Sequence, residues 1–296
     1  MKDIVEQINE FRRKTTRRFR FRNLINYYFF KEKRVKKLYF NRMGVQLNLE
    51  RPKSYNEKLQ WLKLNYYNDL WIKCANKATV RDYLKDKGLE RFACPTLGIY
   101  RKVREINFEH FQKPVVIKIA NASGFNLFVS SVNSENITQI KKCLRAMQKE
   151  KYYRYYFEWV YKSYPYIIIE PYLESYGTEF DYKFHCINGE IVLLQVLNST
   201  LDNITNATFD KEFNRLSCTY GWEDTKADIS KPPFFEEMVK VVKILAKDFL
   251  EVRIDCIAHG EKFYINELTF FPGSGYDIFD PNTIDEQMGE MLQLEG

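Results

Sequence analysis

The sequence predicts an α+β protein whose strands pair mainly as antiparallel hairpins. Three candidate hairpins carry this prediction, and they lie at residues 114–130, at 179–197 around Asn188-Gly189, and at 253–269. Each joins two β-type segments through a short polar or glycine-containing connection, which favours antiparallel pairing. Helical patterns at 54–65, 77–87, 135–150 and 234–250 supply the α part.

Length and composition are those of an ordinary globular protein. The chain has 296 residues, enough for a large core in one domain or two, with 45% hydrophobic and 29% charged residues. No uncharged run approaches the ~18–20 residues that cross a bilayer, and no apolar segment follows the N-terminal charges as in a secretory signal. Six cysteines and three histidines are scattered without C-x-x-C spacing, which argues against zinc and disulfide frameworks and indicates a reducing compartment.

The net charge of +7 is concentrated near the N-terminus. Between Arg12 and Lys37 there are twelve lysines and arginines and one acid, Glu32, with aromatic residues interleaved from Phe19 to Phe30. Such a segment suits an anionic surface, either membrane phosphates or nucleic acid, and no nucleic-acid-binding signature accompanies it. We therefore expect contact with a membrane surface. The alternative is a solvated helix whose apolar face packs on its own domain.

Two helices are expected before the first hairpin. Ser54-x-x-Glu57 is a capping box that predicts a helix through Asn65. Asn76 is expected to cap a second helix from Lys77 to Lys87, closed by Gly88. Four-residue spacing then places Lys77 and Arg81 on one helix face, where a solvated pair is the simplest interpretation.

Lys118 interrupts the apolar strand that begins at Pro114. A buried lysine needs an anionic partner, so its position points to an anion nearby. The loop that follows, Asn121 to Asn126, contains Ser123 and Gly124 and offers backbone N–H groups and a hydroxyl to a phosphate. It lacks the G-x-x-x-x-G-K-[ST] pattern and is therefore not a P-loop.

A strictly alternating segment runs from residue 179 to 186. Its polar face carries Glu179, Asp181, Lys183 and His185. Asn188-Gly189 then predicts a hairpin to the segment 191–197. The polar face either is solvated or lines a cleft, and a cleft is favoured because Lys183 is the last cation before Lys211. The polar, turn-rich segment 198–231 is expected to be loop.

The hairpin at 253–269 carries two acids and an arginine. Arg253 and Asp255 share one strand face, while Val252, Ile254 and Cys256 share the other. On the second strand, Glu267 and Thr269 are expected to share a face with Ile265, and Asn266 to lie opposite. If Asp255 and Glu267 are to converge, the connection needs an odd number of residues. A loop of His259, Gly260 and Glu261 meets this condition and places Arg253 opposite Glu267, with Asp255 on the diagonal.

Two carboxylates and a guanidinium beside a glycine-rich turn suit a divalent cation and phosphates, because Mg²⁺ prefers one or two carboxylates plus phosphate oxygens. A surface salt bridge across the strands is the alternative interpretation of the same residues.

Several motifs occur in a familiar order. They are Lys77 on a helix, Lys118 before a glycine loop, Glu170, Tyr172 and Leu173 around Pro171, Gly177 and Glu179, Arg253-x-Asp255, and Glu267 followed by Pro272-Gly273. This set resembles the ATP-grasp ligases. Asn56-Glu-Lys-Leu-Gln-Trp, Asp181-Tyr-Lys-Phe and the segment 266–275 resemble the TupA-like group, which is associated with teichuronopeptide and capsular polysaccharide synthesis. The resemblance covers Ser54 to Leu294.

The resemblance implies that ATP and Mg²⁺ are bound. Lys77 and Lys118 would hold the phosphates, with Ser123 and Gly124 in a closing flap. Glu170, Tyr172 and Leu173 would receive adenine, and Glu179 would bind the ribose. Asp255 and Glu267 would bind Mg²⁺, and Arg253 would steady the anion formed on the acceptor. Thr269 departs from a common Glu-x-Asn metal pattern. Lys183 would replace a phosphate-facing cation that is missing between Phe184 and Asp210.

The resemblance also implies an architecture with two α+β subdomains that grip ATP between mainly antiparallel sheets. Residues 1–53 would form a basic, aromatic extension, 54–111 a helical region, 112–169 the small subdomain with the flap, and 170–296 the large subdomain with the metal site.

The implied activity is a carboxylate–amine ligase of cell-surface polysaccharide synthesis, which would be cytoplasmic, either free or peripheral at the inner face of the membrane. It would join a uronic or amino acid carboxylate to an amine through an acyl phosphate. A glycosyltransferase or an ATP-dependent phosphotransferase of the same pathway is the alternative. No Asp-x-Asp motif supports the glycosyltransferase.

Overall fold

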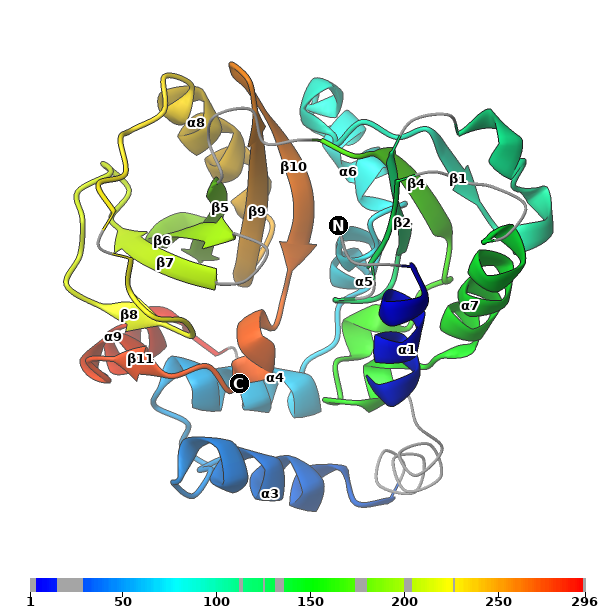
Figure 1. Ribbon diagram of the computed structural model, residues 1–296. Coiled ribbons are helices and arrows are strands. Elements are labelled where there is room, and N and C mark those ends of the chain that lie inside the picture. Colours follow the sequence, from blue (N-terminus) through cyan, green and yellow to red (C-terminus); the bar gives the residue numbers. More distant parts are fainter. Residues whose placement is uncertain are drawn as a thin grey trace.

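A computed structural model of the chain describes residues 4–14, 29–111, 114–124, 126–130, 136–173, 180–199, 204–225 and 227–294. The predicted α+β class is confirmed, and the described sheets are antiparallel. Figure 1 shows two lobes side by side, one built on a five-stranded sheet and the other on a four-stranded sheet.

The five-stranded sheet has the strand order β10-β9-β5-β6-β7. Its strands are β5 (Phe180–Ile187), β6 (Glu190–Ser199), β7 (Ile204–Phe209), β9 (Glu251–His259) and β10 (Lys262–Thr269). Strand β7 and the short pair of β8 (Thr219–Tyr220) with β11 (Phe279–Asp280) contradict the loop predicted over 198–231. The prediction was wrong because the polar side chains of Asn206 and Thr208 are buried and donate to backbone carbonyls, rather than facing solvent.

The two faces of this sheet differ in chemistry. Val252, Ile254 and Cys256 are fully buried on the apolar face, as predicted, together with apolar residues of helix α8 (Phe235–Ala246). Alternation along β9 therefore sends Arg253 and Asp255 to the opposite face. That polar face is turned toward the other lobe.

The four-stranded sheet has the order β1-β4-β2-β3. Its strands are β1 (Gly98–Tyr100), β2 (Val115–Ile119), β3 (Asn126–Val129) and β4 (Ile167–Pro171). Helix α7 (Ile137–Lys149) contributes Ile140, Leu144 and Met147 to the core of this lobe. Helix α1 (Ile4–Lys14) is fixed to β3 by the side-chain amide of Gln7, which bonds both the N–H and the carbonyl of Phe128.

The predicted capping box is present at the start of helix α4 (Tyr55–Asn65), with Ser54 and Glu57 in the expected roles. Helix α4 runs beneath the lobes in Figure 1 and contacts helix α9 (Thr283–Met291). One stripe of α4 is polar yet fully buried, and it consists of Asn56, Gln60 and Lys63. These side chains pack against the segment that follows β10.

The second predicted helix begins later than expected. Helix α5 (Asp69–Ala75) was not predicted, and helix α6 spans Val80–Asp86. Asn76 lies in the turn between them, where its side chain accepts from the Ala78 N–H and donates to Ser163 Oγ and the Tyr164 carbonyl. Lys77 is consequently not helical, and the predicted solvated pair with Arg81 does not form, because Arg81 donates to the Cys94 carbonyl.

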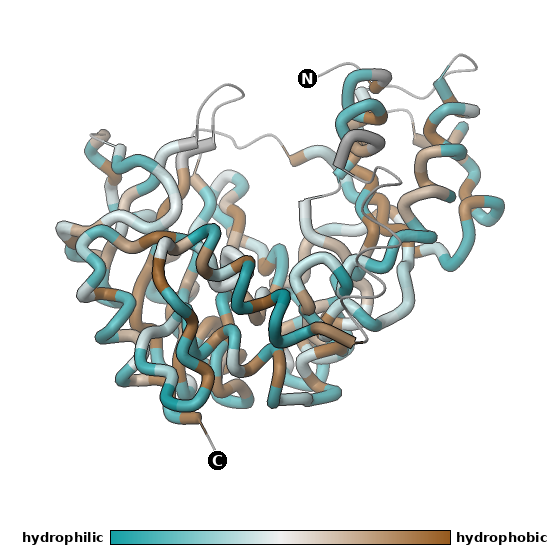
Figure 2. Tube along the Cα trace, turned by 90° about the horizontal axis from the view of Figure 1, so that it is seen from below, coloured by the Kyte–Doolittle hydropathy of each residue, from teal (hydrophilic) through white to brown (hydrophobic). Residues whose placement is uncertain are grey.

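Helix α3 (Lys31–Met43) crosses the underside of the molecule (Figure 1, Figure 2). Its apolar side buries Val35 and Tyr39 against Phe157 and Tyr276, while its outer side is exposed. The rest of the predicted basic segment, residues 15–28, lies outside the described residues. None of the described helices has both the length and the apolarity that crossing a bilayer requires. All six cysteines are buried and unpaired, as expected.

Candidate active site

Strands β9 and β10 bring the two predicted metal-binding acids together. Glu267 lies directly opposite Asp255 in the ladder, and Thr269 lies opposite Arg253. The predicted convergence of the two carboxylates is therefore present. The predicted pairing of Arg253 with Glu267 is wrong.

The convergence arises from a bulge rather than from the turn. Lys262 pairs with His259, so the connection is the two-residue turn Gly260-Glu261 and not the predicted three-residue loop. The register shifts between Ile265 and Glu267, which leaves Asn266 as an extra residue in β10. Because of this bulge, Ile265 is buried with Cys256 on the apolar side and does not share the face of Glu267, contrary to the prediction.

Asp255 is held by two cations on its own face. Arg253 donates from Nε and Nη2 to the two carboxylate oxygens, at 2.6 and 2.8 Å, and Lys183 Nζ lies 2.7 Å from Oδ2. Asp255 is 2% exposed, so these contacts replace hydration. Burial lowers the pKa of Arg253, but the Asp255 carboxylate outweighs burial and raises that pKa overall. The pair is therefore ionised.

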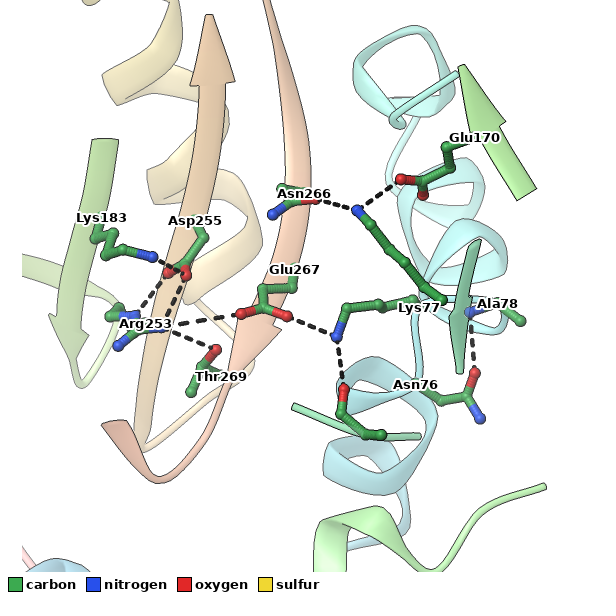
Figure 3. A network of polar contacts seen from close by, with 12 residues as sticks. Asn76, Lys77, Ala78, Glu170, Lys183, Arg253, Asp255, Asn266, Glu267 and Thr269 are labelled. Atoms are coloured by element: carbon green, nitrogen blue, oxygen red, sulfur yellow. Dashed lines mark hydrogen bonds and ion pairs between the residues drawn. The ribbon is translucent and has the colours of Figure 1, made fainter. Parts of the chain in front are cut away.

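Glu267 connects the two lobes. Its carboxylate lies 2.6 Å from Lys77 Nζ, which also donates to the Ala122 carbonyl at 3.0 Å, and 4.0 Å from Arg253 Nη2 (Figure 3). Burial raises the pKa of Glu267, but Lys77, Lys183 and Arg253 lower it overall, well below its usual range. Glu267 is therefore a carboxylate at neutral pH.

Lys118 makes a second connection between the lobes. Its Nζ lies 2.6 Å from Glu170 Oε2 on β4 and donates to Asn266 Oδ1 at 3.2 Å (Figure 3). Lys118 is 8% exposed, and the anionic partner expected for a buried lysine is Glu170. Burial lowers the pKa of Lys118, but Glu170 raises it overall, so the ammonium is charged.

The other predicted nucleotide-binding residues lie around this centre or outside the described chain. Ser123 and Gly124 follow β2 in an exposed loop, where Gly124 has a φ of 72°. Tyr172 and Leu173 directly follow β4 and are half-buried. Glu179 lies outside the described residues.

Two features of the site were missed by sequence reasoning. Asn266 contacts Lys118 only because of the bulge, and no residue in the strand pattern signals a bulge there. The Pro272–Gly275 turn is held from below by α4, where Gln60 Nε2 donates to the Ser274 and Gly275 carbonyls and Lys63 Nζ donates to the Ser274 carbonyl. The sequence predicted that Leu59 and Leu62 lie on the buried face of α4. It gave no indication that polar residues of the same helix are buried as well.

The donor set fits a hard divalent cation beside phosphates. Asp255 and Glu267 offer carboxylate oxygens from opposite strands, which are the ligands that Mg²⁺ prefers in combination with phosphate oxygens. The described part of the chain contains no group of three or more acidic, cysteine or histidine side chains that could hold a metal ion.

Two antiparallel sheets face each other across charged side chains that belong to both lobes, which is the arrangement of the ATP-grasp fold. The family model described as TupA-like ATPgrasp matches residues 57–293, so the chain belongs to the TupA-like ATP-grasp family. The chain spans less than two thirds of the length of the first solved structures that it is similar to. None of the curated proteins matches its sequence.

Solved structures of similar fold are ligases with low sequence identity. The D-alanine–D-alanine ligase of Bacillus anthracis complexed with ATP is 13% identical, with a TM-score of 0.44 and coverage of 74% of this chain and 65% of that chain. The D-alanine–D-alanine ligase of Helicobacter pylori is 15% identical, with a TM-score of 0.45 and coverage of 82% and 68%. The phosphoribosylamine–glycine ligase of Thermotoga maritima is 13% identical, with a TM-score of 0.41 and coverage of 68% and 49%.

Proposed function

We propose that the protein uses ATP to join the carboxylate of a cell-surface polymer precursor to an amine. The observation that carries this proposal is the row of charges between the lobes, in which Lys77 meets Glu267 and Lys118 meets Asn266. A triphosphate in this row would contact cations from both sheets. Membership of the TupA-like ATP-grasp family supports the ligase chemistry.

The residues of this chain would act mainly by electrostatic preorganisation. Lys77 and Lys118 bind phosphate oxygens, and Ser123 and Gly124 close over them from the loop after β2. Glu170, Tyr172 and Leu173 border the adenine, and Glu179 binds the ribose. Lys183 stands close enough to Asp255 to turn between this acid and a phosphate.

In the first step a carboxylate oxygen of the acceptor attacks the γ-phosphorus and ADP departs with the electrons of the broken P–O bond. The acceptor carboxylate and the γ-phosphate are both anions, and the positive charge of Arg253 would lower the repulsion between them. Mg²⁺, held by Asp255, Glu267 and phosphate oxygens, would supply further positive charge against this repulsion.

In the second step the amine nitrogen attacks the carbonyl carbon of the acyl phosphate. Inorganic phosphate leaves, the nitrogen loses a proton, and an amide forms. Water must be excluded because it would hydrolyse the acyl phosphate, and closure of the 121–126 loop is the movement that would exclude it.

The proposed substrate class and location come from sequence motifs and from the charge of the N-terminal segment. The TupA-like motifs at 56–61, 181–184 and 266–275 favour surface polysaccharide synthesis, with a uronic or amino acid as the carboxylate. The basic N-terminal segment would keep the enzyme near lipid-linked substrates at a membrane surface.

ADP release, measured against a panel of uronic and amino acids paired with amines, tests the proposal. We expect release that requires both a carboxylate and an amine, and mass spectrometry should identify an amide. A stable phosphate ester formed without an amine would instead identify a phosphotransferase. Transfer of a sugar from a nucleotide sugar, without ADP, would identify a glycosyltransferase.

A further inference from the structure

A basic hollow lies on the four-stranded lobe, between the end of β1, the end of α7 and the segment before β4. It has a volume of about 470 Å³ and is lined by Arg101, Lys102, Gln148, Lys151 and residues 162–165. Four of these residues are cations that come from three separate segments: Arg101, Lys102, Lys151 and Lys162. The fold therefore gathers positive charge here that the sequence disperses over about sixty positions.

Arg101 and Lys102 of the hollow are held in place without being neutralised by Glu105. This acid is the nearest to them in sequence, but its carboxylate accepts from the backbone N–H groups of Arg101 and Lys102 at 2.9 and 3.1 Å. No ion pair with a described carboxylate involves Arg101, Lys102 or Lys151. The Arg101 guanidinium lies 4.7 Å from the centre of the Tyr164 ring, which fixes its direction. An anionic partner would complete this arrangement.

The start of α3 adds an apolar component to the same surface. Phe29 is 78% exposed and Phe30 is 52% exposed, and both line a second hollow with Lys31 and Lys33. Helix α3 itself begins with Lys31, Glu32 and Lys33, and Figure 2 shows it as mainly hydrophilic. Phenylalanine has no polar group to satisfy in water, so two adjacent exposed rings favour an apolar environment.

Lys31 links the start of α3 to the basic hollow. Its Nζ donates to the Lys63 carbonyl at 2.7 Å, which fixes the helix start to the body of the protein. Burial and then the charge of Lys162 lower the pKa of Lys31 to about 8. Helix α3 also packs through Val35 and Tyr39 on Phe157, which lies in the chain between Lys151 and Lys162 of the hollow, so the helix and the hollow border the same segment.

We propose that this surface binds an anionic lipid bilayer, with headgroup phosphates in the basic hollow and Phe29 and Phe30 at the acyl boundary. Aromatic insertion beside cations is the pattern of interfacial membrane binding. RNA or a soluble anionic polysaccharide would use the cations but would leave the two phenylalanines in water. The inference deepens the membrane contact proposed above and rests on it, but it extends the contact to residues distant from the N-terminal segment.

The bound orientation would bring the catalytic loop close to the bilayer. Asn121, at the start of the 121–126 loop, donates its side-chain amide to the Tyr161 and Ser163 carbonyls at 3.0 and 2.8 Å. Ser163 also lines the basic hollow. A headgroup in the hollow would therefore lie next to Ser163, whose backbone carbonyl accepts from the first residue of the loop proposed to close over phosphate.

Sedimentation of the full chain with phosphatidylserine–phosphatidylcholine vesicles tests this surface. Changing Lys102 and Lys151 together to Gln should lower the partition coefficient roughly 25-fold, since each lysine near an anionic surface contributes about fivefold. Changing Phe29 and Phe30 to Ser should lower it at least tenfold or so, including at high salt where charge is screened. The matched control changes Lys240 and Lys247 to Gln, two exposed cations at α8 and its end, and should alter binding less than about twofold.

Equal losses in the control and hollow variants would mean general charge attraction and would overturn the proposal, as would vesicle binding that neither variant changes. Loss of RNA or polysaccharide binding with vesicle binding intact would assign the hollow to those partners instead. ADP release with soluble substrates should be the same in wild type and hollow variant. If wild type releases ADP but does not bind vesicles, the proposed membrane-binding surface is wrong and the proposed ligase activity is supported. If wild type binds vesicles but releases no ADP, the membrane-binding surface is supported and the ligase activity is wrong.

Discussion

Replacement of Asp255 by Asn should separate the catalytic role of this residue from its structural one. The side chain keeps its size but loses the charge that pairs with Arg253 and Lys183, at 2.6 to 2.8 Å. Both cations then lose the carboxylate that contacts them most closely, and Glu267, at 4.0 Å from Arg253 Nη2, remains near them. Removal of one member of a buried ion pair typically costs about 3–5 kcal/mol.

The cost can be expressed as a change in melting temperature. The entropy of unfolding is about 2.1 cal/mol/K per residue, or roughly 0.6 kcal/mol/K for a chain of 296 residues. A loss of about 3–5 kcal/mol therefore lowers Tm by about 5–8 °C. ADP release should fall at least about 100-fold, because a preorganised charge at the reaction centre is lost.

Glu251→Gln is the matched control, since Glu251 lies on the same strand and the same face. Burial raises the pKa of Glu251 well above its usual range and so favours the neutral carboxyl group. Gln is neutral as well and keeps an oxygen for Tyr55 Oη, which donates at 2.7 Å. We expect a change in stability within about 1 kcal/mol and nearly unchanged ADP release.

Differential scanning calorimetry and a coupled ADP assay, both at neutral pH, make the comparison. If Asp255→Asn keeps turnover within tenfold of wild type, Asp255 does not take part in the reaction. If the variant loses activity but melts with wild type, the ion pair does not carry the stability assigned to it. A loss in Glu251→Gln as large as that in Asp255→Asn would mean that any change on this face disables the enzyme.

Three further predictions concern neighbouring parts of the site. Asn266→Ala removes a hydrogen bond to a charged lysine, Lys118, and should raise KM for ATP about tenfold; an unchanged KM would contradict the contact. Burial lowers the pKa of Lys63 to about 8, so between about pH 8 and 10 the folded state binds fewer protons than the unfolded chain and stability rises with pH. Denaturant unfolding at about pH 8 and pH 10 should show the free energy of unfolding of wild type rising by roughly 2 kcal/mol relative to that of Lys63→Met. The same difference between the two proteins at both pH values would refute this. Gly275→Ala places a Cβ 2.4 Å from Gln60 Nε2 at a φ of 62° and should cost about 1–3 kcal/mol, so an unchanged Tm would refute the strain.

Face alternation made the chemistry of β9 predictable, but it could not reveal the geometry of β10. Arg253 and Asp255 alternate with residues that α8 buries, and period-two patterning alone separates the two sets. In β10 the bulge at Asn266 changes which residues share a face. A bulge depends on local backbone geometry and on the partner strand, so the sequence predicted that the acids converge but gave the wrong turn and the wrong opposing pair.

Contacts between distant segments were the least predictable part of the site. Lys118 was expected to need an anion, and the anion is Glu170, which the family resemblance implied as an adenine-binding residue. The partner is set by the pairing of β2 with β4, where Val116 lies opposite Glu170. Such pairing is fixed by the packing of the whole lobe rather than by the residues near Lys118, so patterning within either strand cannot supply it.

The cations of the site are paired with acids of the chain itself. Lys77, Lys118, Lys183 and Arg253 are matched by three acids, Glu170, Asp255 and Glu267, at 2.6 to 4.0 Å. Four cations against three acids leave a surplus of one positive charge, which is less than the negative charge of a triphosphate. In the proposed complex Lys77 would exchange Glu267 for phosphate, and the released carboxylate would then need a new cation. The same exchange would leave Glu267, beside Asp255, available to a divalent metal that binds with the nucleotide.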